Sequence, residues 1–132
     1  MKLSQAEWKL MNAIWDRHPA SARDVMERVE GDADWAYTTV KTMLTRLEKK
    51  GALKSRLRAN TTLYQPVLTR DKARRSALRA VLDAAFDGAF GPMMQFLVAE
   101  DNLSKEQREE IVRLLKDAKA KLKNPINSVT PQ

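Results

Sequence analysis

The chain has 132 residues, 43% of them hydrophobic and 31% charged, which fits one globular domain or a small domain with an appendage. It contains no cysteine, a single histidine (His18) and no phosphate-loop, HExxH or GxSxG motif, so we expect no disulfide, metal site, cofactor or enzymatic activity. The net charge is +7, and no apolar run approaches the roughly 18 residues that a membrane helix needs. The amphipathic start is not a signal peptide, so we expect a cytoplasmic protein without membrane insertion.

Two capping boxes predict two short helices at the start of the chain. Ser4 is followed three residues later by Glu7, and Ser21 by Asp24, and each pair precedes apolar residues at helical spacing. The predicted helices cover about residues 4–16 and 22–30. We interpret the tryptophans of the first helix as packing residues, because they recur with other large apolar groups.

The next segment, Trp35 to Gly51, is predicted to form a helix over about residues 37–50 with two different faces. Val40, Met43, Leu44 and Leu47 form an apolar stripe. The opposite side carries threonines and cations without a carboxylate: Thr38, Thr39, Lys41, Thr42, Thr45, Arg46 and Lys49. An ordinary solvated face mixes Glu with Lys, whereas this one suits a negative ligand that approaches closely. Duplex DNA in its major groove is the leading candidate.

A change of period after Gly51 predicts a two-stranded hairpin. Leu53 to Leu57 alternates apolar and polar residues, and a β-branched and aromatic run from Thr61 to Gln65 follows a turn-compatible Ala59-Asn60 pair. Three helices followed by a hairpin is the order of a mainly α winged helix-turn-helix. In that fold the third helix reads base edges and the wing contacts the backbone or the minor groove.

Positive charge is concentrated in one part of the chain. Residues 35–75 hold eleven Lys and Arg against two acids, a net charge of +9, while the other 91 residues sum to −2. A patch of this kind is typical of nucleic-acid binders. A solvated basic surface would explain any single residue, but not the coincidence of the cluster with the threonine-rich helix.

The remaining chain predicts further helices with much apolar area. A helix opens at Thr69 and Asp71 and is broken by Gly88 and by Gly91-Pro92, and Ser104 caps a last helix. Burial against a second copy of the chain is the simplest way to remove these apolar residues from water. The alternative is a monomer in which these helices fold back onto the winged helix. The expected dimer contacts are Leu82, Phe86, Met93, Leu97, Ile111 and Leu115. We therefore predict a DNA-binding domain at 1–68, a helical dimerisation domain at 69–123 and a disordered tail at 124–132.

Several of these segments resemble the penicillinase-repressor family (BlaI/MecI/CopY), over nearly the whole chain. LSQAEWKLMNAIW resembles the family's first helix, ASARDVMERV its second and WAYTTVKTMLTRLEKKG its recognition helix. LYQP resembles the end of its wing and NLSKEQREEIVRLL its last helix. The first-helix and recognition-helix patterns are specific in combination.

The resemblance implies a homodimeric transcriptional repressor that binds a palindromic operator in double-stranded DNA. The family's base contacts carry over onto Thr38, Thr39, Lys41, Thr42, Thr45 and Arg46. Lys41 or Arg46 is expected to donate to guanine, and threonine methyls to contact thymine methyls. The expected phosphate contacts are Lys49, Lys50, Arg56, Arg58, and Ser21 with the first amides of the second helix.

Two departures from the family leave the inducing signal open. In β-lactam-responsive members a membrane sensor protease signals through an Asn-Phe bond; the alignment places Phe96-Leu97 there, and the chain has no Asn-Phe pair. Copper-responsive members carry a cysteine cluster, which is also absent. The sequence specifies neither the operator, nor the regulated genes, nor whether release follows proteolysis or a ligand.

Two other functions compete with the repressor. The first is a protein-interaction or architectural module that kept the winged helix without sequence-specific DNA binding, since a fold alone does not fix function. The second is an enzyme such as a nuclease, which needs clustered acids or histidine. The basic region offers only Glu48 and Asp71.

Overall fold

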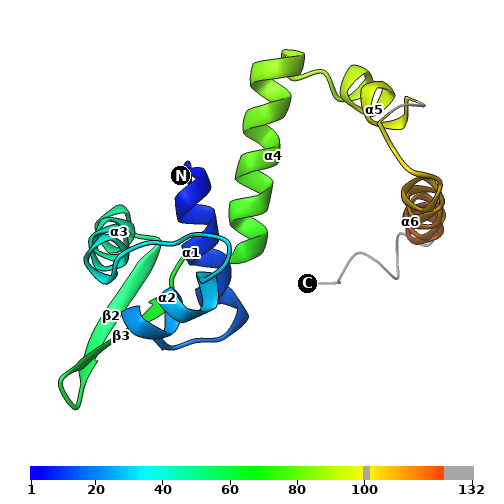
Figure 1. Ribbon diagram of the computed structural model, residues 1–132. Helices are drawn as coiled ribbons and strands as arrows, with labels where there is room; N and C mark the ends of the chain where they lie inside the picture. Colours follow the sequence, from blue (N-terminus) through cyan, green and yellow to red (C-terminus); the bar gives the residue numbers. More distant parts are fainter. Residues whose placement is uncertain (100–101, 124–132) are drawn as a thin grey trace, which may run out of the picture. The chain divides into compact units, whose positions relative to one another are not determined.

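The computed structural model describes residues 1–99 and 102–123 (Figure 1). The chain divides into two compact units, the first from Met1 to Val81 and the second from Leu82 onward, and each is described by itself. The predicted tail at 124–132 lies outside the described residues. The elements in chain order are α1 (Gln5–Asp16), β1 (Ala20–Ser21), α2 (Ala22–Val29), α3 (Tyr37–Lys50), β2 (Leu53–Arg58), β3 (Thr61–Pro66), α4 (Arg70–Phe86), α5 (Phe90–Val98) and α6 (Lys105–Lys123).

Local capping signals begin and end the helices of the first unit. The boxes at the start of α1 and α2 are both present, with Ser4 bonded to Glu7 and Ser21 to Asp24. Gly51 ends α3 in the left-handed conformation, at φ +88°, which a glycine adopts without steric cost. These parts of the sequence prediction are confirmed.

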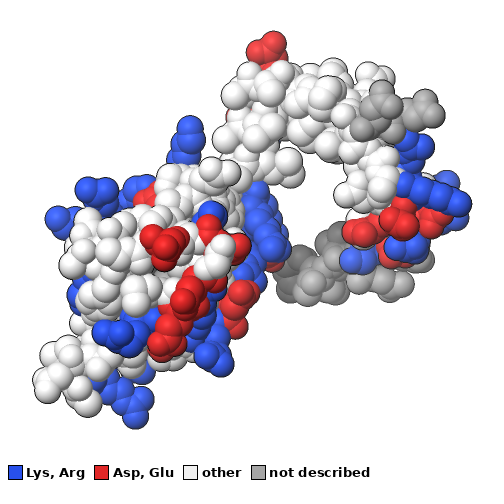
Figure 2. All heavy atoms as spheres, viewed as in Figure 1, with Lys and Arg blue, Asp and Glu red and all other residues white. Residues whose placement is uncertain are grey.

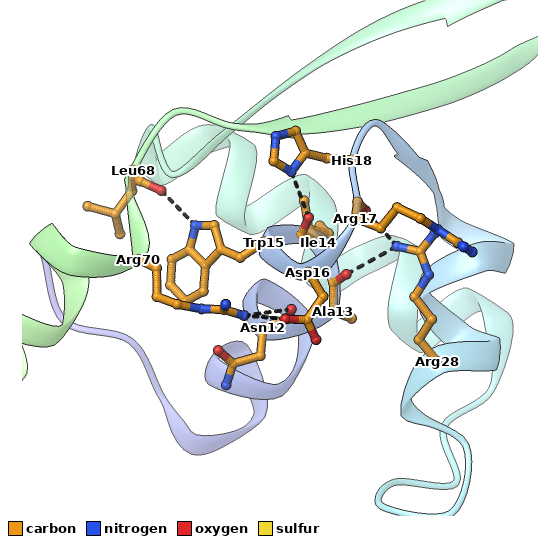
Figure 3. A network of polar contacts seen from close by, with 10 residues as sticks. All are labelled: Asn12, Ala13, Ile14, Trp15, Asp16, Arg17, His18, Arg28, Leu68 and Arg70. Atoms are coloured by element: carbon orange, nitrogen blue, oxygen red, sulfur yellow. Dashed lines mark hydrogen bonds and ion pairs between the residues drawn. The ribbon is translucent and has the colours of Figure 1, made fainter.

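Side chains cap the C-terminal end of α1 (Figure 3). Arg28 of α2 donates from Nη1 to the carbonyls of Ala13 at 3.1 Å and Arg17 at 2.7 Å. The Nδ1 atom of His18 lies 3.0 Å from the carbonyl oxygen of Ile14. The last carbonyls of a helix lack intrahelical partners, so these contacts satisfy some of them and tie α1 to α2.

A three-stranded antiparallel sheet with the order β1-β3-β2 carries the wing. The hairpin pairs Leu53 with Pro66 at one end and Arg58 with Thr61 at the other. Ala59 and Asn60 both have positive φ, 48° and 67°, as a two-residue hairpin turn of the primed type requires. The sequence prediction contained the hairpin but not β1, whose two residues are defined only by their pairing with β3.

The core of the first unit lies between the three helices and the sheet. Its largest fully buried side chains come from α1, α2 and α3: Leu10, Met11, Ile14, Val25, Val40, Leu44 and Leu47. Burying a side chain of this size stabilises a fold by about 1.5–3 kcal/mol. Trp8 and Trp15 pack at the edge of this core with their rings edge to face, 5.8 Å between centroids. The packing role predicted for these tryptophans is confirmed.

The second unit contains the end of α4, then α5 and α6. α4 ends before Asp87 and Gly88, which both have positive φ. The prediction that Gly91-Pro92 also interrupts helical structure was wrong, because the pair lies in the first turn of α5. A proline is tolerated there, since the first amides of a helix have no intrahelical acceptor. Ser104 and Gln107 form the predicted capping box of α6.

Glu7 connects the start of α1 with the end of α3. Its carboxylate accepts a hydrogen bond from the Ser4 amide and pairs with the Lys50 ammonium, whose Nζ lies 2.8 Å from both carboxylate oxygens. Burial by itself would raise the pKa of Glu7. The hydrogen bonds from Lys50 and Ser4 outweigh burial and hold this pKa below its ordinary value of 4.5.

We expect Glu7→Gln to lower the free energy of unfolding near neutral pH by about 1–2 kcal/mol, because a charged acceptor is lost. The folded pKa lies below the unfolded one. The carboxylate therefore stabilises the fold fully above 4.5 and loses this effect as pH falls through the folded pKa. Urea unfolding at neutral and acid pH should show a gap between the two proteins that closes on acidification. The control is Glu27→Gln, at an exposed position of α2; a gap that stays constant would contradict this role.

Candidate nucleic-acid interface

The buried stripe of α3 turns the opposite side of this helix to the surface. Val40, Leu44 and Leu47 are fully buried, and a helix repeats every 3.6 residues, so the side chains between them point outward. The exposed set comprises Thr38, Thr39, Thr42, Thr45, Arg46 and Lys49, with Lys41 half-buried beside them. The structure thus brings these seven predicted residues together on one helix.

Two threonine hydroxyls on this face donate to the helix backbone. Oγ1 of Thr42 donates to the carbonyl of Thr38 at 2.9 Å, and Oγ1 of Thr45 to that of Lys41 at 3.0 Å. Each hydroxyl proton is therefore engaged, while the methyl group and an oxygen lone pair stay available. Such a surface suits thymine methyls and the amino donors of adenine or cytosine.

The carboxylate of α3 is bound to the wing. Glu48 lies on the flank of the helix, and its Oε2 accepts a hydrogen bond of 2.7 Å from the hydroxyl of Ser55 in β2. This bond fixes the base of the wing against α3. It also keeps the negative charge of Glu48 at the side of the exposed face rather than on it.

A hollow of about 310 Å³ lies between the starts of α2 and α3 and the wing. Its lining consists of Ser21, Ala22, Arg23, Tyr37, Lys41, Asn60, Thr61 and Thr62. The guanidinium of Arg23 lies over the ring of Tyr37, 5.4 Å from its centroid. This stacking holds an exposed cation at the edge of the hollow. Sequence reasoning did not select Arg23; its place directly after a predicted helix start was the available signal.

Ser21 lies in the same hollow, but its polar groups are partly occupied. Its hydroxyl oxygen accepts from the Asp24 amide at 3.1 Å, and its own amide donates to Asp24 Oδ2 at 3.0 Å. The bond from the Ser21 backbone holds the pKa of Asp24 below its ordinary value of 3.8. The amide and the hydroxyl oxygen of Ser21 are therefore engaged with the ionised Asp24, and the phosphate contact at Ser21 stays a prediction beside the exposed cation of Arg23.

The predicted phosphate contacts divide into two groups. Lys49, Arg56 and Arg58 are exposed on α3 and β2. Lys50, by contrast, is paired with Glu7 and belongs to the scaffold between α1 and α3. Figure 2 shows Lys and Arg along the side of the first unit that carries α3 and on the wing, whereas acidic side chains gather over α2.

Within the part of the chain that the structure describes, no group of three or more His, Cys, Asp or Glu is arranged to hold a metal ion. Among the same residues, no helix combines the length and the apolar character needed to cross a membrane.

Three packed helices, a hairpin wing and an exposed face of threonines and cations on the third helix define a winged helix-turn-helix protein. The sequence model of the family described as penicillinase repressor matches residues 3–117. The chain belongs to this family.

Known proteins with similar sequences are named as regulators. The methicillin resistance regulatory protein MecI of Staphylococcus aureus is 27% identical over 114 residues, covering 86% of this chain and 93% of MecI. A penicillinase repressor of Bacillus licheniformis is 26% identical over 122 residues, covering 92% and 95%. The solution structure of monomeric Bacillus licheniformis BlaI with the blaP half-operator matches with 29% identity and a TM-score of 0.48, covering 55% of this chain and 88% of that one.

Arg23 provides a test of the hollow between α2, α3 and the wing. We expect Arg23→Gln to weaken binding to every duplex by a similar factor of about 3–10, and to lower the slope of log affinity against log salt by about 1. Fluorescence anisotropy at several salt concentrations measures both quantities. The control is Arg74→Gln, which removes an exposed cation of α4. Equal effects of the two substitutions would contradict the assignment.

Proposed function

We propose that this chain is a DNA-binding transcriptional repressor that reads duplex DNA with the exposed face of α3. The observation that carries the proposal is the combination of a fully buried aliphatic stripe with an opposite side of threonines and cations. Family membership and the names of the relatives support the same function. We place this activity in the cytoplasm.

The proposed contacts separate reading from positioning. Arg46, exposed and fork-shaped, donates to guanine O6 and N7, and the methyls of Thr42 and Thr45 contact thymine methyls. Thr38, Thr39 and Lys41 complete the reading face. Phosphates are bound by Lys49, Arg56, Arg58, Arg23 and Ser21. These contacts set the register of the protein on the duplex without sequence discrimination. We leave Lys50 out of this set because of its bond to Glu7.

We further propose that the repressor is a homodimer on a palindromic operator, with residues 1–68 binding DNA and 69–123 forming the dimer. Leu97 is 40% exposed and Leu115 is 58% exposed, and such apolar side chains on neighbouring helices favour burial by a partner. Leu82, Phe86 and Ile111 are half-buried, and Met93 is buried within its own chain. A two-fold dimer places half-site centres roughly one helical turn apart, or a small multiple of it.

The release of such a repressor needs a signal. A membrane sensor protease is one candidate, but it would have to act at a bond other than Asn-Phe, because the sequence has no such pair.

The proposed function is tested by titrating labelled promoter fragments from the neighbouring genes with the purified protein. Specific complexes form typically about 10³–10⁷ times more tightly than complexes with random duplex at physiological salt. We therefore expect the protein to remain bound to at least one promoter fragment in the presence of a large excess of random competitor DNA. Binding to every fragment that is no tighter than binding to random duplex would reject the repressor and favour an architectural module.

The division between reading and positioning makes opposite predictions for two arginines. Arg46→Ala should cost about 1–3 kcal/mol on the preferred duplex and relax preference at one base pair, because the fork to guanine is lost. Arg58→Ala should weaken all duplexes alike and reduce the salt dependence. Affinities for a panel of single-base-pair variants measure both effects. A uniform loss in both mutants would contradict the assignment of Arg46 to base reading.

Leu115→Asp tests the dimer. The substitution should raise the dimer dissociation constant by roughly 100-fold or more, because it buries an unpaired carboxylate in the proposed interface. Sedimentation velocity over a range of concentrations measures the constant. Lys116→Asp, which changes the next residue of α6, serves as the control. An unchanged dimer with Leu115→Asp would remove this position from the interface.

A further inference from the structure

We propose that Arg70 fixes the direction in which α4 leaves the winged helix, and thereby sets the half-site spacing that the dimer tolerates. This inference rests on the proposed function, because it assigns spacing specificity to a residue outside the DNA-contacting surface. The group formed by Arg70, Trp15, Asp16 and the carbonyls of Asn12 and Leu68 is called the Arg70 clasp below.

Arg70 is the first residue of α4 and makes three contacts with α1 (Figure 3). Its Nη2 donates to Oδ1 of Asp16 at 2.7 Å and to the backbone carbonyl of Asn12 at 3.1 Å. Its guanidinium also lies over the ring of Trp15, 5.4 Å from the centroid. One guanidinium thus binds a carboxylate, a helix carbonyl and an aromatic face together.

Trp15 extends the clasp to the segment before α4. Its indole Nε1 donates to the backbone carbonyl of Leu68 at 2.9 Å. The ring is in turn held by Trp8, edge to face. The chain is therefore tied to α1 on both sides of Thr69, at Leu68 and at Arg70.

The Arg70 clasp fixes the direction of α4 relative to α1, whereas apolar packing attaches the helix to the first unit. Ala73 is buried with the core of the first unit, so the base of α4 is anchored by apolar packing as well. Apolar packing is not directional, whereas a hydrogen bond weakens steeply when it is misaligned. The contacts of Arg70 consequently select one orientation of the helix around the pivot at Ala73.

A fixed helix direction has a consequence for a dimer on DNA. α1 packs in the same core as α3, so a helix fixed to α1 is also fixed to the reading face. The part of α4 from Arg70 to Val81 belongs to the first unit, and the proposed dimer contacts begin at the next residue, Leu82. A dimer whose two reading faces are joined through rigid helices binds half-sites at one separation. A dimer with a mobile connection binds half-sites at several separations, but the second reading face then has a lower effective concentration at its half-site.

The test compares Arg70→Gln with Arg74→Gln, an exposed arginine one turn further along α4 that carries the same charge change. The probes are the palindromic duplex that the wild-type protein selects from a random pool, versions with one to three base pairs inserted at its centre, and a duplex with a single half-site. We expect insertion to cost the wild type and Arg74→Gln about tenfold or more in affinity, but Arg70→Gln less than about threefold. Affinity for the single half-site should stay within about twofold for all three proteins.

Two results would overturn the proposal. An insertion penalty in Arg70→Gln equal to that in Arg74→Gln would show that spacing does not depend on the clasp. An equal loss on half-site and palindrome would show that Arg70 supports the winged helix itself. If Arg70→Gln does not unfold cooperatively, Trp15→Phe takes its place. This substitution keeps an aromatic ring but removes the bond to Leu68, so it should also lower the insertion penalty.

A failure of the proposed function is recognised separately. In that case the wild-type protein selects no duplex from the pool. Amide hydrogen exchange at residues 73–77 then tests the clasp without DNA. Faster exchange in Arg70→Gln than in Arg74→Gln supports the clasp, and equal rates overturn it.

Discussion

The burial of one aliphatic stripe on α3 determines which face of this helix the first unit exposes. Val40, Leu44 and Leu47 are fully buried against α1, α2 and the sheet, and each contributes about 1.5–3 kcal/mol when it leaves water. No rotation of α3 about its axis can expose these side chains without losing that free energy. The orientation of the threonines and cations on the other side is therefore fixed by the core, before any ligand is present.

The positive potential on the exposed face of α3 depends on the hydrogen bonds and the ion pair of three nearby carboxylates. Glu7 is paired with Lys50, Asp24 accepts from Ser21, and Glu48 accepts from Ser55. Each of these acids thereby has an internal partner at an end or a flank of the helix region. The cations of the exposed face keep their positive potential, which is what an approach to a phosphate backbone requires. The same bonds hold the wing and α1 in place, so they stabilise the fold and shape its charge at once.

Local signals made much of this structure predictable from the sequence. The capping boxes at Ser4 and Ser21, the stop at Gly51 and the hairpin turn at Asn60 are short-range features, and all are confirmed. The exposed side of α3 followed from its period, although its base contacts stay predictions. Pairings between distant residues were not predictable: the strand β1, the bond of Lys50 to Glu7, Arg23 on Tyr37, and Arg70 on α1. Many side chains in the chain could have met these partners, and only the packed fold selects among them.

We propose that the exposed face of α3 is the part of this protein that meets DNA. This proposal can be tested by an NMR titration of the isotope-labelled protein with a duplex carrying one half-site. We expect the largest chemical-shift changes at the methyls of Thr38, Thr42 and Thr45, with smaller changes at Arg23 and along the wing. Changes concentrated in α5 and α6, with the threonine methyls of α3 unmoved, would contradict it.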